Sequence, residues 1–386
     1  MGQVHDILII GAGIAGASLG YRLAGQRQVL MLEREAQPGY HSTGRSAAMF
    51  MEAYGTPQIQ ALTRASRAFY EQPPAGFAEH PLLEPRGCLY VASHEQRHLL
   101  ETTYAQNLAN GTAVSLLDSA AALALVPSLR GELLAGAVHE TGAMDLDVHA
   151  LHQGFLRGFR QAGGELRCNA ELVKAHYLDD LWHIELADGS RLRARQLVNA
   201  AGAWADRVAA QCGVDTVGLQ PCRRSAFTFP GPAQHDFAGW PAVIGVDESF
   251  YFKPDAGQLL GSPANADPVE PQDAAPDELD LALGIYNIEA MTTLEIRRPS
   301  HSWAGLRSFV ADGDLVIGFD PVSPAFFWLA AQGGYGIQSA AGASRLAADL
   351  LLGQPLCSSL VRQGVEPARL SPARFNQSNV ELSHEQ

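Results

Sequence analysis

The chain has 386 residues, of which 47% are hydrophobic, and it carries a formal net charge of −14 at pH 7. This length exceeds the usual size of one compact domain, so we expect two domains that share a cleft. The negative charge disfavours nucleic acids and anionic membrane surfaces as partners, because binding to either requires concentrated Lys and Arg.

The five cysteines and thirteen histidines show no spacing typical of a metal site, so no bound metal is expected. His149 and His152, three positions apart on one predicted helix, are expected to face solvent and not to bind a metal. The cysteine pattern fits reduced thiols in a cytoplasmic enzyme. The apolar run at residues 7–10 is too short to span a bilayer, so no transmembrane segment is expected.

A strand, a glycine-rich turn and a helix open the chain. The apolar run Ile7–Ile10 enters Gly11-Ala-Gly13-Ile-Ala15-Gly16, and a helical pattern follows up to Leu23. The first glycine permits the turn, the second lets a pyrophosphate approach the backbone, and the third allows the helix to pack closely on the strand. The positive helix N-terminus favours the phosphates. The motif therefore predicts a bound dinucleotide.

A second apolar run, Val29–Leu32, ends on Glu33. That carboxylate follows the glycines by about 20 residues, where an acid accepts the hydroxyls of an adenosine ribose. An acid at this position argues against NADP, whereas NAD and FAD both fit. The polar segment that follows, Gly39–Ser46, has hydroxyls and backbone N–H groups that suit phosphate oxygens, and Ala47 and Ala48 leave room for a flat ring. An ordinary surface loop is the alternative.

The alternation of strands and helices is lost at residues 51–142 and returns at Asp147. Asp147 is a good N-cap for a helix that ends at Gly163-Gly164. Short strands are then predicted at residues 173–177, 182–186 and 191–195, and a further strand runs from residue 197 into Ala201 and Gly202. Residues 225–229 are strand-like, and 251–253 with 259–261 flank a turn at 254–257. The acidic, proline-rich stretch 267–280 is expected to be a solvated loop.

Strand character resumes at residues 315–318 and 327–330, and a helix is predicted from about Gln338 to Leu352. Between them lies the turn Gly333-Gly-Tyr-Gly336, which faces the N-terminus of that helix. A positive dipole there would stabilise negative charge on the N1 and C2 carbonyl of a reduced flavin, which favours flavin over nicotinamide. A plain strand-to-helix turn is the alternative.

These stretches resemble the FAD-binding family of D-amino acid oxidases, glycine oxidases and D-amino acid dehydrogenases, most closely the bacterial D-arginine dehydrogenases. The resemblance covers nearly the whole chain. It rests on the stretches 33–48, 53–56, 198–204, 247–251, 303–309 and 331–338.

The resemblance implies an α/β fold in which a Rossmann-like FAD-binding domain is interleaved with an α+β substrate domain. We expect the FAD-binding domain at residues 1–50, 143–210 and 310–366, the substrate domain at 51–142 and 211–309, and a polar tail at 367–386. FAD is expected to bind noncovalently, since no attachment motif is recognisable. The expected cofactor contacts are Gly11, Gly13, Ala15, Gly16, Glu33, Arg34, Ser42, Thr43, Gly44, Arg45, Ser46, Ala47, Ala48, Val173, Ala201, Gly202, Gly333, Gly334, Tyr335, Gly336, Ile337 and Gln338.

Amino-acid oxidation needs a cation for the substrate carboxylate, and Arg224 and Arg307 are the candidates because each lies among apolar residues. A structural ion pair is the alternative for each. Tyr54 and Tyr251 match tyrosines that line the substrate pocket in the family. The resemblance also places Gly334 and Gln338 at this pocket. Hydride would pass from Cα to flavin N5, and water would hydrolyse the imino acid to a 2-oxo acid and ammonia.

The chain departs from the D-arginine dehydrogenases at two positions of the substrate pocket. Cys88 stands where they carry a glutamate that faces the substrate cation, and Met49 replaces a histidine. The pocket should therefore prefer neutral and apolar D-amino acids, unless Glu52 restores a negative charge.

Two other functions fit the sequence. One is an oxidase that produces H2O2 from D-amino acids, glycine or N-methyl amino acids, and the other is a dinucleotide-binding module without catalysis. The electron acceptor, a quinone or O2, is not specified by the sequence.

Overall fold

The computed structural model describes residues 3–375, which form three β-sheets and ten α-helices. The first sheet contains β1 (Val4–Ile10), β2 (Val29–Leu32), β9 (Glu165–Arg167), β10 (Leu172–Leu178), β11 (Leu181–Leu186), β12 (Arg191–Asn199), β19 (Val316–Phe319) and β20 (Phe326–Ala330). The strands β20, β12, β1, β2 and β9 lie side by side and are parallel. A parallel sheet of this kind is typical of nucleotide-binding α/β domains, so the predicted Rossmann-like architecture is confirmed.

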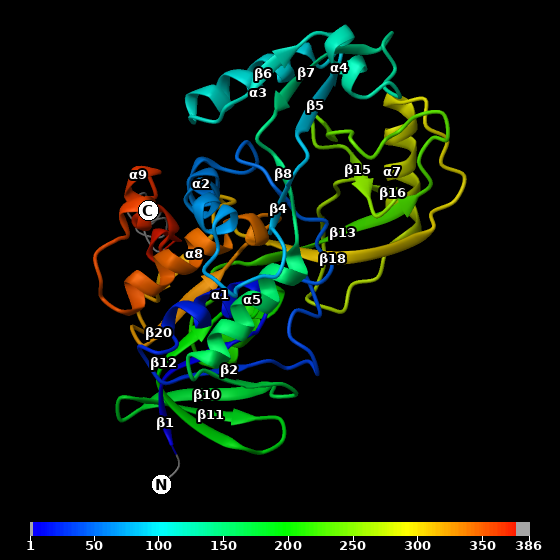
Figure 1. The fold of residues 1–386 in the computed structure, drawn as a ribbon. Coiled ribbons are helices and arrows are strands. Elements are labelled where there is room, and N and C mark those ends of the chain that lie inside the picture. The colour runs from blue at the N-terminus through cyan, green and yellow to red at the C-terminus, as the bar shows by residue number, and fades with distance from the viewer. Residues whose placement is uncertain (1–2, 376–386) are drawn as a thin grey trace, which may run out of the picture.

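The two faces of this sheet are covered by different elements (Figure 1). One face packs against α1 (Ile14–Leu23), α5 (Val148–Gln161) and α8 (Gly336–Leu351), and α8 also contacts α2 (Pro57–Glu71). The other face packs against the β10–β11 hairpin and α6 (Ala205–Gln211). The central strands β1 and β2 are almost wholly apolar because both their faces are covered.

The second sheet contains β5 (Cys88–Ser93), β6 (Ser115–Leu117), β7 (Leu134–Glu140), β13 (Gln220–Phe229), β14 (Ala242–Gly245), β15 (Tyr251–Asp255), β16 (Gln258–Ser262), β17 (Asp267–Pro268) and β18 (His301–Phe309). Its strands come from two separate parts of the chain, which alternate with the strands of the first sheet. The predicted interleaving of two domains is therefore confirmed, whereas the proposed boundaries between them remain a proposal. A small sheet of β3 (Met49–Phe50), β4 (Leu83–Pro85) and β8 (Met144–Leu146) lies between the two.

The remaining helices are α3 (Arg97–Ala109), α4 (Ser119–Leu125), α7 (Glu278–Met291), α9 (Ser358–Arg362) and α10 (Pro367–Leu370), with 3-10 turns at Gly202–Trp204 and Pro372–Phe375. The region expected to be a polar tail thus begins with two short helices, and Leu370 is fully buried. The rest of that region, residues 376–386, lies outside the described residues. No helix within residues 3–375 is both long and apolar enough to cross a membrane.

Several local predictions are confirmed. Asp147 caps α5, and its Oδ1 accepts the backbone N–H of Ala150 at 2.8 Å. The predicted meander forms as β10, β11 and β12, although residues 191–199 make one continuous strand instead of two. The hairpin of β15 and β16 turns at Ala256–Gly257, so Pro254 belongs to the strand.

The prediction of a solvated loop at residues 267–280 is wrong for its last residues, which belong to α7. Asp280 lies in the first turn of α7 and is 9% exposed. Its Oδ2 accepts a hydrogen bond from Ser225 Oγ at 2.8 Å and pairs with Arg223 Nε at 3.0 Å. An acidic residue in this stretch therefore joins α7 to β13 instead of facing solvent.

Candidate cofactor and substrate site

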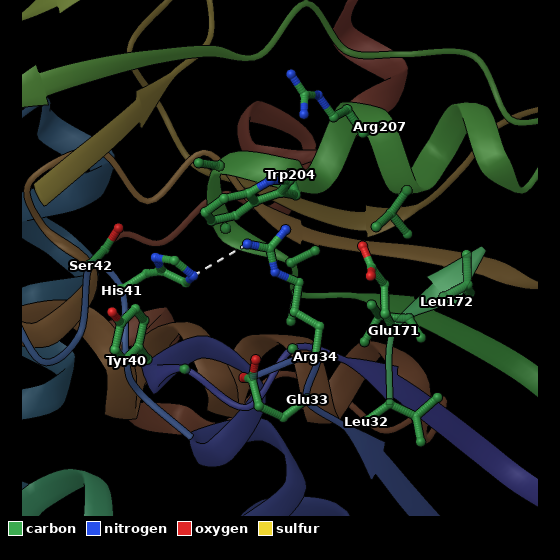
Figure 2. A pocket seen from close by; sticks show the side chains of 18 of the residues that line it. Leu32, Glu33, Arg34, Tyr40, His41, Ser42, Glu171, Leu172, Trp204 and Arg207 are labelled. Carbon is green, nitrogen blue, oxygen red and sulfur yellow. Dashed lines mark hydrogen bonds between the residues drawn. The ribbon is translucent and has the colours of Figure 1, made fainter. Parts of the chain in front are cut away.

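Three adjoining cavities form a groove from the carboxyl ends of the parallel strands to the second sheet. The outer cavity, of about 270 Å³, is lined by the glycine turn and by Glu33 (Figure 2). The middle cavity, of about 100 Å³, shares Gly13 and Thr43 with the outer one. The inner cavity, of about 80 Å³, shares Arg307 and Gly334 with the middle one. A groove built this way suits a long dinucleotide with its reactive end innermost.

Two positions of the opening turn require glycine, because a side chain there would clash with neighbouring backbone atoms. A Cβ on Gly11, whose φ is +99°, would lie 2.4 Å from the carbonyl oxygen of Ala200. A Cβ on Gly16 would lie 1.9 Å from the carbonyl oxygen of Gly11. The turn therefore packs directly on the loop after β12, and it leaves the helix N-terminus of α1 beside the outer and middle cavities.

Glu33 is positioned at the end of β2 by two backbone groups. Its Oε2 accepts the N–H of Ala12 at 3.0 Å, and its Oε1 accepts the N–H of Glu35 at 3.0 Å. The side chain is 9% exposed and lines the outer cavity. These bonds hold the carboxylate at the place where a ribose would bind.

His152 supports the same turn from α5, and the expectation that it faces solvent is wrong. It is 4% exposed, and its Nε2 lies 2.8 Å from the carbonyl oxygen of Ala12. Burial lowers the pKa of His152, which favours the neutral ring. His149, one turn earlier on α5, is exposed as expected.

A stack of side chains forms one wall of the outer cavity (Figure 2). The guanidinium carbon of Arg34 lies 4.0 Å from the ring centre of Trp204, and the ring of His41 lies 4.6 Å from that of Trp204. Arg34 also pairs with Glu35, with 2.9 Å between Nε and Oε1. Trp204 and His41 were not among the predicted cofactor contacts, although Trp204 follows the predicted Gly202 by two residues.

Not every predicted cofactor contact lines the groove with its side chain. Arg45 donates to the carbonyl oxygens of Ala274 at 2.9 Å and Ala304 at 3.2 Å, and it lines a separate surface hollow. Val173 is 41% exposed, and the neighbouring residues 170–172 line the outer cavity in its place. The other predicted contacts that border the three cavities are Gly11, Gly13, Ala15, Glu33, Arg34, Ser42, Thr43, Ser46, Ala47, Ala48, Ala201, Gly202, Gly333, Gly334, Gly336, Ile337 and Gln338.

The inner cavity contains both predicted arginines because β13 and β18 are antiparallel neighbours. Cys222 lies opposite Arg307 and Arg224 lies opposite Gly305, so the two arginines share one face of the sheet. Arg224 Nη1 donates to Tyr54 Oη at 3.3 Å, and its Nε donates to the carbonyl of Asn265 at 2.9 Å.

Arg307 has no hydrogen-bond partner for its buried Nε among the described residues. Burial and the neighbouring Arg224 lower the pKa of Arg307, although a guanidinium stays charged at any physiological pH. Two cations thus meet in this cavity, and Arg307 forms no ion pair within residues 3–375. The arrangement calls for an external anion.

Tyrosines and an amide complete the wall of the inner cavity. Tyr54 and Tyr251 line the cavity, and the ring of Tyr335 packs against that of Tyr54 with 4.8 Å between the ring centres. Gln338 Nε2 donates to the carbonyl of Tyr54 at 3.4 Å. Met49 and Gly334, which the resemblance assigns to the substrate pocket, also line this cavity.

Cys88 and Glu52, in contrast, do not line the inner cavity. Cys88 is fully buried in β5, and burial raises the pKa of its thiol well above the usual value. Glu52 points to α2, where its Oε1 accepts from Arg67 Nε at 2.7 Å. The expectation that Glu52 supplies a charge to the pocket therefore finds no support in its contacts.

Two charged residues that the sequence did not single out line the inner cavity instead. Glu248 is exposed at the rim of the cavity, where the cavity wall removes part of its solvent and so raises the pKa of Glu248, whereas Arg224 opposes that shift. Lys253 is 6% exposed, and its Nζ pairs with Asp145 Oδ1 at 2.7 Å. Glu248 lies within the stretch 247–251 that resembles the family, three residues before Tyr251. This closeness in sequence to a predicted pocket residue could have indicated that Glu248 lines the pocket.

The groove offers unpaired polar groups that suit FAD. Both amide atoms of Gln332, which lines the middle cavity, are buried without a hydrogen-bond partner among the described residues. Together with the glycine cradle and Glu33, they provide donors and acceptors along the whole groove.

The model of the FAD-dependent oxidoreductase family named DAO matches residues 6–350. The chain belongs to this family. As a member, it is an FAD-dependent oxidoreductase with FAD as its cofactor.

Two curated relatives illustrate the breadth of the family. FAD-dependent oxidoreductase domain-containing protein 1 of Bos taurus is 24% identical, over 90% of this chain and 81% of the relative. Glycine oxidase of Geobacillus kaustophilus is 23% identical, over 90% of this chain and 93% of the relative.

Solved structures share the fold. The crystal structure of glycine oxidase from Geobacillus kaustophilus has a TM-score of 0.83 and 21% sequence identity, covering 96% of this chain and 98% of that one. L-alpha-glycerophosphate oxidase from Mycoplasma pneumoniae with FAD bound has a TM-score of 0.82 and 18% identity, covering 91% and 95%.

Proposed function

We propose that this oxidoreductase oxidises the Cα–N bond of D-amino acids and releases 2-oxo acids and ammonia. The observation that carries the proposal is Arg307, a cation that has no anionic partner within residues 3–375 and whose buried Nε lies at the junction of the middle and inner cavities. A substrate carboxylate would satisfy it, and Arg224 in the same cavity would share the charge.

The chain's own groups would orient the substrate for reaction. Arg307 and Arg224 would bind the carboxylate, and the phenols of Tyr54 and Tyr251 would donate hydrogen bonds to it. Holding the substrate this way fixes Cα relative to the groove, and such positioning is the main contribution that a protein makes in cofactor enzymes. The glycine turn, Glu33 and Gln332 would hold FAD, which would supply the hydride acceptor for Cα. The amine lone pair would form the C=N bond as the hydride leaves, and water would then hydrolyse the imino acid to the 2-oxo acid and ammonia.

The inner cavity supports a preference for neutral and apolar side chains. Its wall contains Met49, Met51 and Ile244. Glu248 is exposed at the rim, and the nearby charge of Arg224 opposes the rise in its pKa, so a cationic substrate side chain would gain little there. The preference for the D configuration rests on the resemblance of the sequence motifs to those of D-amino acid enzymes.

Anaerobic mixing tests the proposal. We expect D-leucine to bleach the FAD absorbance of the holoenzyme, and L-leucine to bleach it at least about a hundredfold more slowly. An enzyme reduced by no D-amino acid would contradict the proposal, and a dinucleotide-binding module without catalysis would give that result.

An oxidase acting on glycine or N-methyl amino acids is a second candidate. It is supported by the similarity to glycine oxidase along most of both chains and by the small volume of the inner cavity, about 80 Å³. Reduction by glycine or N-methylglycine in place of D-leucine would favour it. The yield of H2O2 in air then separates an oxidase from a dehydrogenase that uses another acceptor such as a quinone.

A further inference from the structure

Glu140 is the last residue of β7 and lies beside the loop that carries Tyr54. We propose that Glu140 is a positioning residue for substrate binding, because its carboxylate fixes the backbone of residues 52–55 and thereby holds Tyr54 beside Arg224. The proposal rests on the proposed function, in which Tyr54 and Arg224 receive the substrate carboxylate.

The contacts of Glu140 are made with the backbone of this loop. Its Oε1 accepts the N–H of Glu52 at 2.6 Å and the N–H of Ala53 at 3.3 Å. Its Oε2 is buried and has no hydrogen-bond partner among the described residues, and the residue is 1% exposed. One carboxylate therefore satisfies two consecutive amides that lie just before Tyr54.

The backbone of this loop depends on side chains for its hydrogen bonds because the loop is not part of a β-sheet. β3 ends at Phe50 and α2 begins at Pro57, and residues 51–56 pair with no strand of the part of the chain that the structure describes. Gln60 Nε2 donates to the carbonyls of Ala53 and Gly55, both at 3.1 Å. Buried backbone groups without partners are costly, so these side chains decide the path of the loop and, with it, the place of Tyr54.

Tyr54 links this loop to the substrate site. Its Oη accepts from Arg224 Nη1 at 3.3 Å, and its ring contacts Tyr335 with 4.8 Å between the ring centres. A shift of about 1 Å in a group that positions substrate is enough to reduce activity strongly. Loss of the contacts made by Glu140 should therefore weaken substrate binding more than it slows the reaction step.

Groups from three elements face Glu140. Glu52 lies in the loop itself, Arg67 comes from α2, and Cys88 and Tyr90 come from β5. Burial, with a smaller contribution from the charge of Glu52, raises the pKa of Glu140 to about 7, although the two backbone N–H groups and Arg67 act in the opposite direction. Above this pH the residue is a carboxylate and a strong acceptor, whereas below it the neutral acid is a weaker acceptor.

Hydrogen exchange tests the structural step without substrate. Exchange of the amides of Glu52 and Ala53 in the FAD holoenzyme is followed by mass spectrometry at pH 6.0 and 8.5, after correction for the intrinsic effect of pH. We expect protection about tenfold higher at pH 8.5, because a charge-assisted hydrogen bond is about twice as strong as a neutral one. Equal protection at both pH values would overturn the proposal.

Kinetics with Glu140→Gln test the functional step. The amide keeps an acceptor oxygen but has no charge, so we expect the KM for D-leucine to rise about tenfold at pH 8.5 and to match the wild type at pH 6.0, with a much smaller change in kcat. Glu140→Asp keeps the charge and should retain a dependence of KM on pH. A purely structural role would instead lower the thermal stability and leave the pH profile of KM unchanged.

Glu71→Gln is the matched control. Glu71 pairs with Arg67, with 3.1 Å between Nη1 and Oε1, and 44% of its side chain is exposed. It belongs to the same charge cluster without touching the loop, so its loss should leave KM at every pH unchanged. If Glu140→Gln fails to fold, the exchange measurement on the wild type still decides. If D-leucine fails to reduce the wild type, the proposed function is contradicted, while the exchange measurement still tests the role of Glu140 in the loop.

Discussion

Replacing Arg307 by methionine should abolish most substrate binding energy while leaving FAD in place. Methionine fills a similar volume with an apolar, flexible chain, so the groove should keep its shape. The change removes the guanidinium that has no anionic partner within residues 3–375. It leaves Arg224, which stays anchored by the carbonyl of Asn265 and by Tyr54 Oη.

The size of the loss follows from these contacts. Truncating one member of a buried, hydrogen-bonded charge pair costs about 2 to 5 kcal/mol. Arg224 can still contact a substrate carboxylate, so the upper end does not apply, and we expect a loss of about 3 kcal/mol. Since about 1.4 kcal/mol corresponds to a factor of ten, kcat/KM for D-leucine should fall about 150-fold.

The assay compares kcat/KM of the wild type with that of Arg307→Met, together with the FAD content of each protein. Arg297→Met is the control, because 92% of the Arg297 side chain is exposed, and we expect no change from it. A value of kcat/KM for Arg307→Met within about threefold of the wild type would remove Arg307 from the site and refute the carboxylate reasoning.

Three further results are expected. The protein should purify yellow, and acid precipitation should release intact FAD into the supernatant, whereas colour in the pellet would contradict noncovalent binding. Glu33→Gln should weaken FAD binding by the apoprotein at least about tenfold in a fluorescence titration, because the charged acceptor is lost; an unchanged Kd would exclude a role in ribose binding. Cys88→Glu should lower the free energy of unfolding in urea by at least about 2 kcal/mol, because it buries a second carboxylate beside Glu140, and a stable variant that prefers D-arginine would instead restore the role first predicted for residue 88.

The first domain could be predicted largely from sequence because its signals are local. The apolar runs of β1 and β2 and the glycines between them specify strand, turn and helix without reference to the rest of the chain. The N-cap at Asp147 is equally local. These are features in which a few neighbouring residues determine the backbone.

Helix α7 could not be predicted in this way. The residues that it buries are Asp280, Gly284 and Ile288, spaced four apart along one face. Leu281, Ile285, Ile288 and Met291 follow helical spacing and pack on the core. Large apolar residues also occupy the exposed side of the helix, namely Leu279, Leu283 and Tyr286, so the sequence shows no contrast between an apolar and a polar face. The burial of Asp280 depends on Ser225 and Arg223 in a distant strand, which no local pattern contains.

In the candidate site, too, some residues could be identified from their neighbours in sequence and others could not. Arg224 and Arg307 could be selected because cations among apolar residues are unusual. The position of Cys88 could not, since β5 is buried on both faces and alternation along it does not distinguish cavity from core. Glu248 and Lys253 line the cavity only because the turn before β15 and the strand itself fold against β14 and β16.

The pairing of β13 with β18 also limits where the chain can accept insertions or deletions. Nine consecutive residue pairs, from Gln220 with Phe309 to Thr228 with His301, keep Arg224 and Arg307 on one face. An insertion of one residue within either strand would turn one arginine to the opposite face. The connection between the strands, residues 230–300, includes β16 and β17, which pair with β13, and Asn265, whose carbonyl accepts a hydrogen bond from Arg224. Insertions and deletions in the turns of this connection, away from those contacts, can reshape the substrate side of the protein while the carboxylate-binding pair stays where it is.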